Sequence, residues 1–332
     1  MFDYLYWEFV RDSLLTDGIV AIAFVTDHQG SSPGRKGFRF AIDKNSRTFG
    51  TVGGGIMEYN IIKEMKSLLT NSILSSKNFT LLELIHNRKV SKDKQSGLIC
   101  SGKQSVIYGL LTNDDLPIIK DIIKLFFDNN NHVLTITPKS FTLSKNNTQL
   151  SYNEGKINFI INGEDWAFEL KTSLHNHIYI FGAGHVGQAI SNLFETLNFV
   201  IHVLDFREDL IMKSIKEEKW ITREFIEDYA RIQTSILESK NTYIAVVNAN
   251  SLHDIESLFA IIRKKFNYIG LMGTTAKRIE IFKALRERGV TEEEISQIVS
   301  PIGVNIKSQT SAEIAISIAS QIIILKNSKT SY

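Results

Sequence analysis

The sequence predicts an α/β fold in two domains, the second of them a Rossmann-type domain with a doubly wound parallel sheet. Three observations support this prediction. The chain has 332 residues, about twice the length of a typical domain. From residue 177 onwards, short apolar strands alternate with amphipathic helices. A glycine-rich turn at residues 182–187 joins the first of these strands to its helix. We place the boundary between the two domains at residues 175 and 176.

The first domain, residues 1–175, is predicted to be mixed α/β with a β-rich end. Residues 19–25 form an apolar, β-branched run, and residues 38–42 alternate as a half-buried strand does. A helix is expected after the glycines at 53–55, because apolar residues recur there at helical spacing. These residues are Met57, Ile61, Met65, Leu68 and Leu69.

The remainder of the first domain reads as strands separated by turns. Residues 98–100 lead into a strand-like run at 104–108. Residues 130–172 contain short β segments that we expect to form a β meander. The polar residues 171–176 are the predicted linker to the second domain.

The second domain, residues 176–332, shows regular alternation of strands and helices. Its strands are expected at residues 178–181, 200–204, 243–247 and 268–272. The helix after the first strand has an apolar stripe of Val186, Ile190, Leu193, Phe194 and Leu197. Two later helices are predicted to begin with capping boxes, Thr291 with Glu294 and Thr310 with Glu313. This order predicts a parallel sheet with helices on both faces.

Charge and composition exclude several classes of protein. Lys and Arg total 38 and Asp and Glu total 36, so the net charge of +2 is too small for a broad nucleic-acid surface. The longest uncharged apolar stretch, residues 314–325, is shorter than the roughly 20 residues that cross a bilayer. The first residues do not resemble a signal peptide, and a single cysteine cannot form an intramolecular disulfide. We therefore expect a cytoplasmic protein that binds neither nucleic acid nor membranes.

The glycine-rich turn at residues 182–187 is the clearest functional motif. Gly182 permits a tight turn, Gly184 lets a pyrophosphate approach the backbone, and Gly187 allows close packing of helix and strand. Asp205 ends the next strand, 18 residues after Gly187, where a carboxylate would meet a ribose hydroxyl. These features predict a nucleotide-binding site. The alternative is a Rossmann scaffold that has lost its cofactor or holds another ligand.

Five further residues of the second domain are candidates for the same site. His185 could approach a phosphate or a pterin, or be a solvated loop histidine. Arg207 could stack on an adenine, neutralise a phosphate, or lie on the surface. Gly273, Lys277 and Arg278 follow another strand at the carboxyl edge of the sheet, where open α/β sheets bind ligands. The commoner alternative is that Lys277 and Arg278 are solvated surface charges.

The first domain contains a second candidate anion site. Its glycines are Gly53, Gly54 and Gly55, ahead of a predicted helix. A nearby basic loop contributes Ser31, Ser32 and Arg35. Glycines before a helix leave backbone N–H groups accessible, and hydroxyls and cations favour an anion. The alternative is two unrelated surface turns.

Cys100 lies in a glycine-flanked segment, residues 97–102. A lone cysteine is usually a small buried hydrophobic residue. In an exposed turn, its thiolate could instead coordinate a soft metal or carry sulfur.

Together these segments resemble the xanthine dehydrogenase accessory factor family, the XdhC/CoxI-like proteins. The matching motifs occur in order along most of the chain except roughly residues 115–175. In the first domain they are residues 30–33 with Gly37 and Arg39, residues 50–55 with Glu58, and Cys100. In the second domain they are residues 181–187, 205–207, 270–273, 276–278, 301–303 and 313–315.

The resemblance implies a non-catalytic role. Members of this family are thought to bind molybdenum cofactor (molybdopterin), protect it and deliver it to an apo molybdenum hydroxylase such as xanthine dehydrogenase. By resemblance, both domains contact the pterin phosphate and Cys100 faces the cofactor as its metal ligand. The resemblance also implies a homodimer and a cysteine desulfurase as a further partner.

The sequence departs from the family pattern at three places. The family's Cys-Gly-Gly is Cys100-Ser101-Gly102. Residues 248–251 lack the histidines that the family often has there, although Asp254 agrees with the pattern, and Ser300 stands where a histidine is common. These departures leave the client and the form of the cofactor open. The alternative functions are an NAD(P)-dependent oxidoreductase that uses the glycine-rich turn with bound NAD, and a regulatory nucleotide sensor. No residue stands out as a general acid for hydride chemistry, which weighs against the oxidoreductase.

Overall fold

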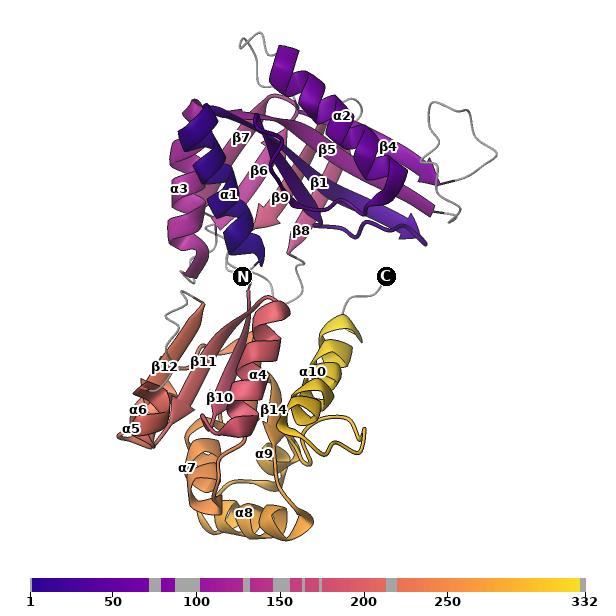
Figure 1. The fold of residues 1–332 in the computed structure, drawn as a ribbon. Coiled ribbons are helices and arrows are strands. Elements are labelled where there is room, and N and C mark those ends of the chain that lie inside the picture. The colour runs from indigo at the N-terminus through magenta and orange to yellow at the C-terminus, as the bar shows by residue number, and fades with distance from the viewer. Residues whose placement is uncertain are drawn as a thin grey trace. The chain divides into compact units, whose positions relative to one another are not determined.

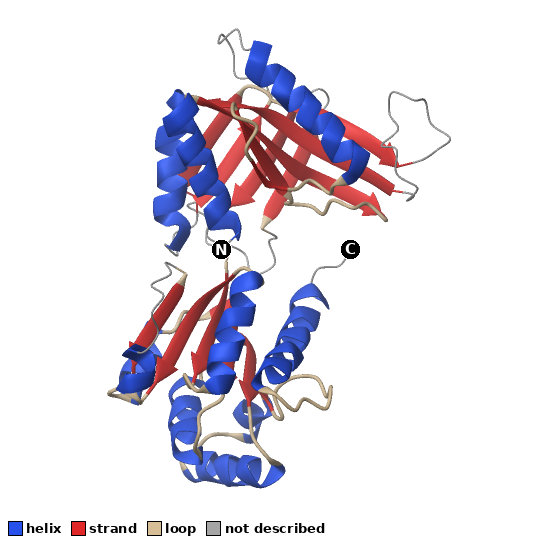
Figure 2. Cartoon of the chain, viewed as in Figure 1, coloured by secondary structure: helices blue, strands red, loops and turns tan. Residues whose placement is uncertain are grey.

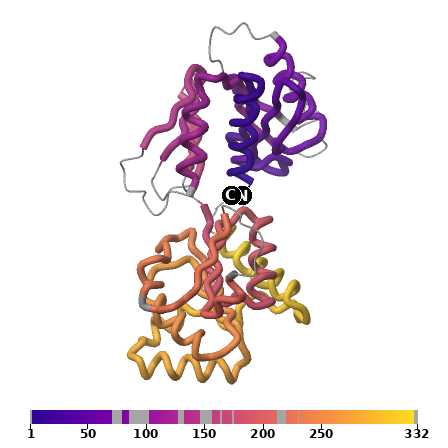
Figure 3. Tube along the Cα trace, turned by 60° about the vertical axis from the view of Figure 1, so that its left-hand side comes forward, coloured from indigo at the N-terminus to yellow at the C-terminus, as the bar shows by residue number. Residues whose placement is uncertain are grey.

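The structure is a computed structural model. It describes residues 2–71, 79–86, 102–127, 132–145, 156–162, 165–172, 175–212 and 220–328. The chain divides into two compact units, Phe2–Leu174 and His175–Tyr332. The first unit runs from indigo to magenta and the second to yellow in Figures 1 and 3, and each is described below by itself.

A five-stranded antiparallel sheet forms the centre of the N-terminal unit. Its strands are β1 (Ile19–Gly30), β2 (Arg39–Asp43), β3 (Thr48–Gly50), β4 (Thr80–His86) and β5 (Gly102–Thr112). The order is β3-β2-β1-β5-β4, so the long, apolar β1 lies in the middle. The strand predicted at residues 38–42 is present as β2, but its predicted half-buried character is wrong, because every residue of β2 is buried. Both faces of the sheet are covered at that point.

Helix α2 (Gly55–Asn71) covers one face of this sheet (Figures 1 and 2). Four of the five residues of its predicted apolar stripe, Met57, Ile61, Met65 and Leu69, are buried against alternate residues of β1. The fifth, Leu68, is only partly buried. The opposite face of β1 packs on α1 (Phe2–Asp17). Helix α1 also packs on α3 (Leu116–Lys124), which lies between two short 3₁₀ turns, Asn113–Asp115 and Leu125–Phe127. Because both faces of β1 are buried, the strand reads as an unbroken apolar run.

A second, four-stranded antiparallel sheet completes this core. Its strands are β6 (His132–Thr137), β7 (Ser140–Lys145), β8 (Ile157–Asn162) and β9 (Asp165–Lys171). The order is β7-β6-β9-β8, so the predicted meander is wrong. The apolar faces of β6 and β9 both pack into the core, which places these two strands side by side in the centre of the sheet. The more exposed β7 and β8 lie at its edges.

The predicted linker at residues 171–176 is shorter in the structure. Lys171 ends β9, and Asn176 begins the first strand of the second unit. Thr172 also continues the pairing of β9, because its backbone N–H donates to the His132 carbonyl at 3.0 Å.

The C-terminal unit contains a six-stranded, fully parallel sheet. Its strands are β10 (Asn176–Phe181), β11 (Phe199–Asp205), β12 (Ile221–Phe225), β13 (Ser239–Val246), β14 (Phe266–Leu271) and β15 (Ile298–Val299). The order is β12-β11-β10-β13-β14-β15. Numbered within the unit, this is 3-2-1-4-5-6, the strand order of the Rossmann fold.

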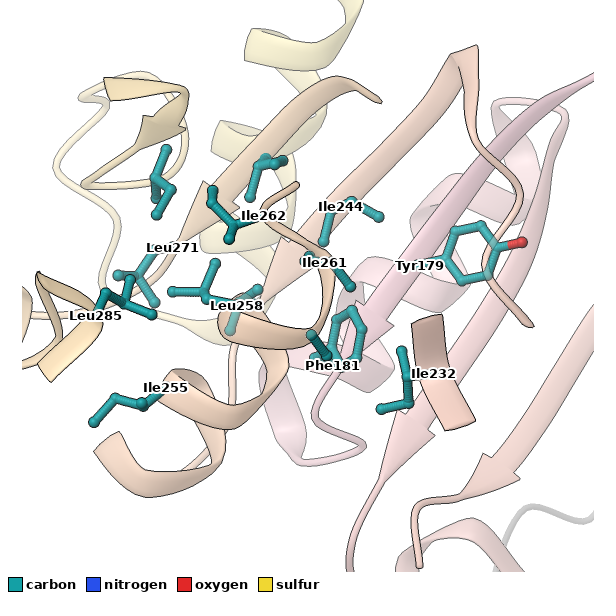
Figure 4. Packing of buried hydrophobic residues seen from close by; sticks show 14 of the residues in the cluster. Tyr179, Phe181, Ile232, Ile244, Ile255, Leu258, Ile261, Ile262, Leu271 and Leu285 are labelled. Atoms are coloured by element: carbon teal, nitrogen blue, oxygen red, sulfur yellow. The ribbon is translucent and has the colours of Figure 1, made fainter. Parts of the chain in front are cut away.

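Helices cover both faces of this sheet, as predicted. They are α4 (His185–Thr196), α5 (Glu208–Met212), α6 (Tyr229–Ser235), α7 (Ser251–Ile261), α8 (Thr275–Glu287), α9 (Glu292–Ser296) and α10 (Ser311–Ser328). Helices α4 and α10 pack on one face, and α6, α7 and α8 pack on the other. Figure 4 shows this second core, where Phe181 and Ile244 of the strands meet Leu258 and Ile261 of α7.

Both predicted capping boxes are present at the starts of α9 and α10. The Thr291 hydroxyl accepts from the Glu294 backbone N–H at 3.2 Å, and the Thr310 hydroxyl accepts from the Glu313 N–H at 3.2 Å. The two glutamates return the bond to the backbone N–H of their threonines. Among the helices that the structure describes, none has the length and apolar character needed to cross a membrane.

Candidate functional site

The glycine-rich turn lies between β10 and α4, at the carboxyl edge of the parallel sheet. Gly182 has a φ of +118°, and a Cβ there would lie 2.8 Å from the Val247 carbonyl oxygen. A Cβ on Gly187 would overlap the Gly182 carbonyl oxygen. The fold itself therefore requires glycine at positions 182 and 187.

Gly184 differs from these two glycines because packing does not explain it. It caps α4 with an extended backbone (φ −69°, ψ −171°) that other residues can adopt. A Cβ there would have only the Arg207 Nη2 nearby, at 3.8 Å. The first N–H groups of α4 have no partner within the helix, and His185 is exposed as its first residue. This open position at a helix N-terminus suits a phosphate that approaches the backbone.

Asp205 ends β11 beside this turn and is fully buried. Its Oδ2 accepts the Ala183 N–H at 2.6 Å, and both of its oxygens accept from the Arg207 side chain at 2.7–2.9 Å. Burial alone would raise the pKa of Asp205, but the hydrogen bonds from Arg207 and Ala183 outweigh it and hold the pKa below its usual value. Asp205 is therefore an ionised carboxylate that fixes both the turn and Arg207.

Lys277, predicted as a ligand-binding cation with solvation as its alternative, forms a buried ion pair. Its Nζ lies 2.5 Å from the Asp254 Oδ2 and 3.3 Å from the Asn248 carbonyl oxygen. Burial raises the pKa of the fully buried Asp254, and Lys277 opposes that effect. The side chain of Lys277 also packs over Gly273. Arg278 is turned to the next strand end, where its Nη1 donates to the Ser300 carbonyl at 2.9 Å.

A stack of aromatic rings, which the sequence did not reveal, lies beside Arg207 at the same edge of the sheet. The rings of Phe206 and His253 are nearly parallel, with their centroids 3.3 Å apart. The Tyr229 hydroxyl is 2.7 Å from the His253 Nδ1, and the Arg207 guanidinium lies 5.2 Å from the Phe206 ring. The rings come from three separate segments, so no local pattern could have predicted the stack.

In the N-terminal unit, the structure brings the two candidate loops together. Gln104 lies between them: its Oε1 accepts from the Ser32 hydroxyl at 2.6 Å and from the Gly34 N–H at 3.1 Å. Its Nε2 donates to the Val52 carbonyl at 2.7 Å. A Cβ on Gly53 would lie 2.6 Å from the Gly34 nitrogen, so the backbones are in contact. A buried glutamine inside an apolar strand was the signal that could have revealed this link.

The glycine turn itself is largely filled by a side chain of the protein. The Glu58 Oε2 accepts the N–H groups of Val52 and Gly54 at 2.8 and 3.0 Å, and the Gly53 N–H donates to the Thr51 hydroxyl at 3.0 Å. An anion at this turn would have to displace the Glu58 carboxylate. The other predicted members, Ser31, Arg35 and Gly55, are exposed.

Cys100, predicted as a metal ligand, lies outside the described residues. Within the described ranges, no group of three or more His, Cys, Asp or Glu side chains could hold a metal ion. The role of Cys100 stays a prediction.

The predicted site residues are divided between the two units, and those of the C-terminal unit form two clusters at the carboxyl edge of its sheet. Gly182, Gly184, His185, Asp205 and Arg207 gather at the carboxyl ends of β10 and β11. Gly273 follows the end of β14 in the same unit. Lys277, on α8, contacts the Asn248 carbonyl just after the end of β13. Both pairs of strands flank the point where the strand order reverses, which is where open α/β sheets bind ligands.

These features define a protein in which a Rossmann-type unit follows an antiparallel α/β unit. Residues 178–322 match the XdhC Rossmann domain, and residues 15–74 match the XdhC and CoxI family. The chain belongs to the XdhC and CoxI family.

Two proteins illustrate its similarity to known sequences and structures. An uncharacterised protein of Escherichia coli K12, YqeB, is 30% identical over 151 residues, which are 45% of this chain and only 27% of that protein. A crystal structure from Bacillus halodurans, described as a xanthine dehydrogenase, superposes with a TM-score of 0.72 at 19% identity. The match covers 100% of this chain and 97% of that chain, and it shows a shared fold.

Proposed function

We propose that this protein is an accessory factor that binds molybdenum cofactor and delivers it to an apo molybdenum hydroxylase of the xanthine dehydrogenase type. Membership of the XdhC and CoxI family supports a role in xanthine dehydrogenase maturation. The protein acts as a carrier and turns over no substrate.

The open backbone at Gly184 is the observation that carries the proposal. Molybdenum cofactor has a phosphate on its pterin, and phosphates bind where a glycine turn opens a helix. At Gly184 the fold leaves room for such a group, although it does not need glycine there. Gly182 and Gly187 hold the turn in shape, and Arg207 adds a cation beside it.

Several finer features belong to the same proposal. Cys100 supplies a thiolate that contacts the molybdenum end of the cofactor, because soft metals prefer sulfur ligands. A cysteine desulfurase and a second copy of the chain are its other partners, and it works in the cytoplasm. These statements rest on the family resemblance.

The proposal is tested by titrating purified protein with molybdenum cofactor and, separately, with NAD. We expect molybdenum to remain with the protein through gel filtration and to restore the activity of an apo hydroxylase. Cys100→Ser is expected to weaken retention without changing the circular dichroism spectrum. Tight binding of NAD with substrate turnover, and no retention of the pterin, would refute the carrier function in favour of an oxidoreductase.

A further inference from the structure

The Asp205 carboxylate has no lone pair left for a ligand. A carboxylate offers about four acceptor positions on its two oxygens. Here Oδ1 accepts the Arg207 backbone N–H at 2.8 Å and its Nε–H at 2.9 Å. Oδ2 accepts the Ala183 N–H at 2.6 Å and the Arg207 Nη2 at 2.7 Å. All four positions are occupied by groups of the protein.

Arg207 is held in this position from a second side. Its guanidinium lies over the Phe206 ring, which stacks on His253, and His253 is hydrogen-bonded to Tyr229. The stack joins the end of β11 to α6 and α7, two helices of the same unit. Removing Arg207 from Asp205 would therefore break a two-pronged ion pair and a ring contact together.

This occupancy matters because dinucleotide sites use the acid at this position. In Rossmann proteins that bind NAD, the carboxylate at the end of the second strand accepts the ribose hydroxyls. In NADP sites, an arginine nearby pairs with the 2′-phosphate instead. Here Asp205 accepts four hydrogen bonds from the protein, so it cannot accept one from a ribose hydroxyl, and two of the five N–H groups of Arg207 are already bound to it.

The same arrangement favours a phosphate at the turn. Asp205 uses the Nε–H and one N–H of Nη2, and a guanidinium has five N–H groups. Arg207 thus keeps three N–H donors, and its Nη2 lies 3.8 Å from the Cβ position of Gly184. A doubly charged phosphate there would meet both the N-terminus of α4 and a guanidinium, its preferred planar partner.

The side-chain oxygen of Asn248 has no hydrogen-bond partner within the described ranges, and the residue is only 1% exposed. Its backbone nitrogen would lie 3.1 Å from a Cβ on Gly182, so Asn248 adjoins the turn. The amide nitrogen of the same side chain donates to the Ser257 hydroxyl of α7 at 3.4 Å, so the Asn248 side chain packs against α7.

We infer that Arg207 makes this site selective for a phosphomonoester and against a dinucleotide. The inference rests on the proposed function, whose cargo has a terminal phosphate, and it deepens that proposal by naming the residue that selects the ligand. Arg207 acts twice: it blocks the ribose-binding carboxylate and presents its free N–H groups to the phosphate.

The test is calorimetric titration of the full-length protein with four probes. Phenyl phosphate is a phosphomonoester without ribose, and NAD, NADP and inorganic phosphate are the competitors. We expect the wild type to bind phenyl phosphate more tightly than any of the other three. Arg207→Ala should weaken phenyl phosphate by roughly 10- to 100-fold, the effect of losing one charged hydrogen bond, and should raise the affinity for NAD.

Two further variants keep the test decisive. Arg207→Lys retains the charge beside the buried Asp205 but loses the two-pronged bond, so a folded protein with weaker phenyl phosphate and tighter NAD binding is expected. Arg231→Ala is the matched control, because Arg231 is 78% exposed in the same unit and should change neither affinity. Circular dichroism verifies that each variant is folded.

Two results would overturn the inference: tighter binding of NAD, NADP or inorganic phosphate than of phenyl phosphate, or unchanged affinities in Arg207→Lys. Retention of molybdenum cofactor, measured in parallel, separates this inference from the proposed function. Retention together with dinucleotide preference refutes the selectivity alone. Phosphomonoester selectivity without retention refutes the carrier function alone.

Discussion

Replacing Lys277 with methionine tests the buried ion pair at the sheet edge. The substitution keeps most of the side-chain length but removes the ammonium group that lies 2.5 Å from the Asp254 carboxylate. Asp254 is fully buried and Lys277 is 20% exposed, so solvent screens the pair only partly. Removing one partner of a buried pair costs about 3–5 kcal/mol.

Protonation of Asp254 limits this loss. At pH 7, protonating a carboxyl with an ordinary pKa near 3.9 costs about 4 kcal/mol, and at pH 5 it costs about 1.5 kcal/mol. In the variant, folded Asp254 binds a proton that the unfolded chain releases, so its stability rises as the pH falls from 7 to 5. We expect a loss of about 3–4 kcal/mol at pH 7 that shrinks to about 1.5 kcal/mol at pH 5.

Urea unfolding of wild type and variant at both pH values measures this difference, with hydrogen exchange reporting on the C-terminal unit. Lys283→Met is the control, because Lys283 lies on the same helix, is 75% exposed and pairs with Glu287 at 3.9 Å. Its loss should stay below about 0.5 kcal/mol. A loss below 1 kcal/mol for Lys277→Met at pH 7, or an equal loss at both pH values, would contradict the reasoning.

Three further predictions concern stability and the turn. Burial lowers the pKa of His177 to about 4 and of His202 to about 3, so acid favours the unfolded chain, and urea unfolding should show a loss of about 2 kcal/mol per histidine between pH 7.5 and 5. Gln104→Leu should destabilise the N-terminal unit by about 3 kcal/mol in urea unfolding, because the buried Gly34 N–H and Val52 carbonyl lose their side-chain partner and Ser32 loses one hydrogen bond. Gly187→Ala should prevent folding of the C-terminal unit, whereas Gly184→Ala should cost less than about 1 kcal/mol in thermal unfolding yet abolish phosphate binding in calorimetry.

The histidine and glutamine predictions each have a matched control. His185→Phe, at an exposed position, should leave the acid sensitivity unchanged, whereas His202→Phe should reduce it. Gln29→Leu, at the exposed end of β1, should not destabilise the N-terminal unit. A stable, folded Gly187→Ala protein would show that close packing at the turn is not required. Full phosphate binding by Gly184→Ala would remove the turn from the site.

The Rossmann unit was predictable because its signals are local. Each strand is an apolar run, each helix has a stripe, and right-handed crossovers leave few ways to order parallel strands. The wrong details of the N-terminal unit depend on distant residues instead. Residues 39–43 are buried on both faces because cover comes from α1 and α2, and the order β7-β6-β9-β8 depends on which strand pairs bury more apolar surface.

The sequence predicted where the candidate site residues lie in the fold, but it did not predict which side chains they contact. The motif treats Gly182, Gly184 and Gly187 alike, and only the surrounding atoms show that two of them serve packing. Lys277 resembles any solvated lysine in the sequence, because its partner Asp254 comes from another helix. Ion pairs between separate elements leave no periodic pattern in the chain.

Asp205 shows why a motif alone cannot decide the ligand. Spacing placed a carboxylate at the end of the second strand, and the structure confirms that position beside the turn. Its chemistry, however, depends on Arg207 two residues later, and spacing alone does not show that the two side chains bind each other. A carboxylate that already accepts four hydrogen bonds anchors the turn and the arginine rather than a ribose. The position of an acid in the motif therefore does not reveal whether its oxygens are available to a ligand.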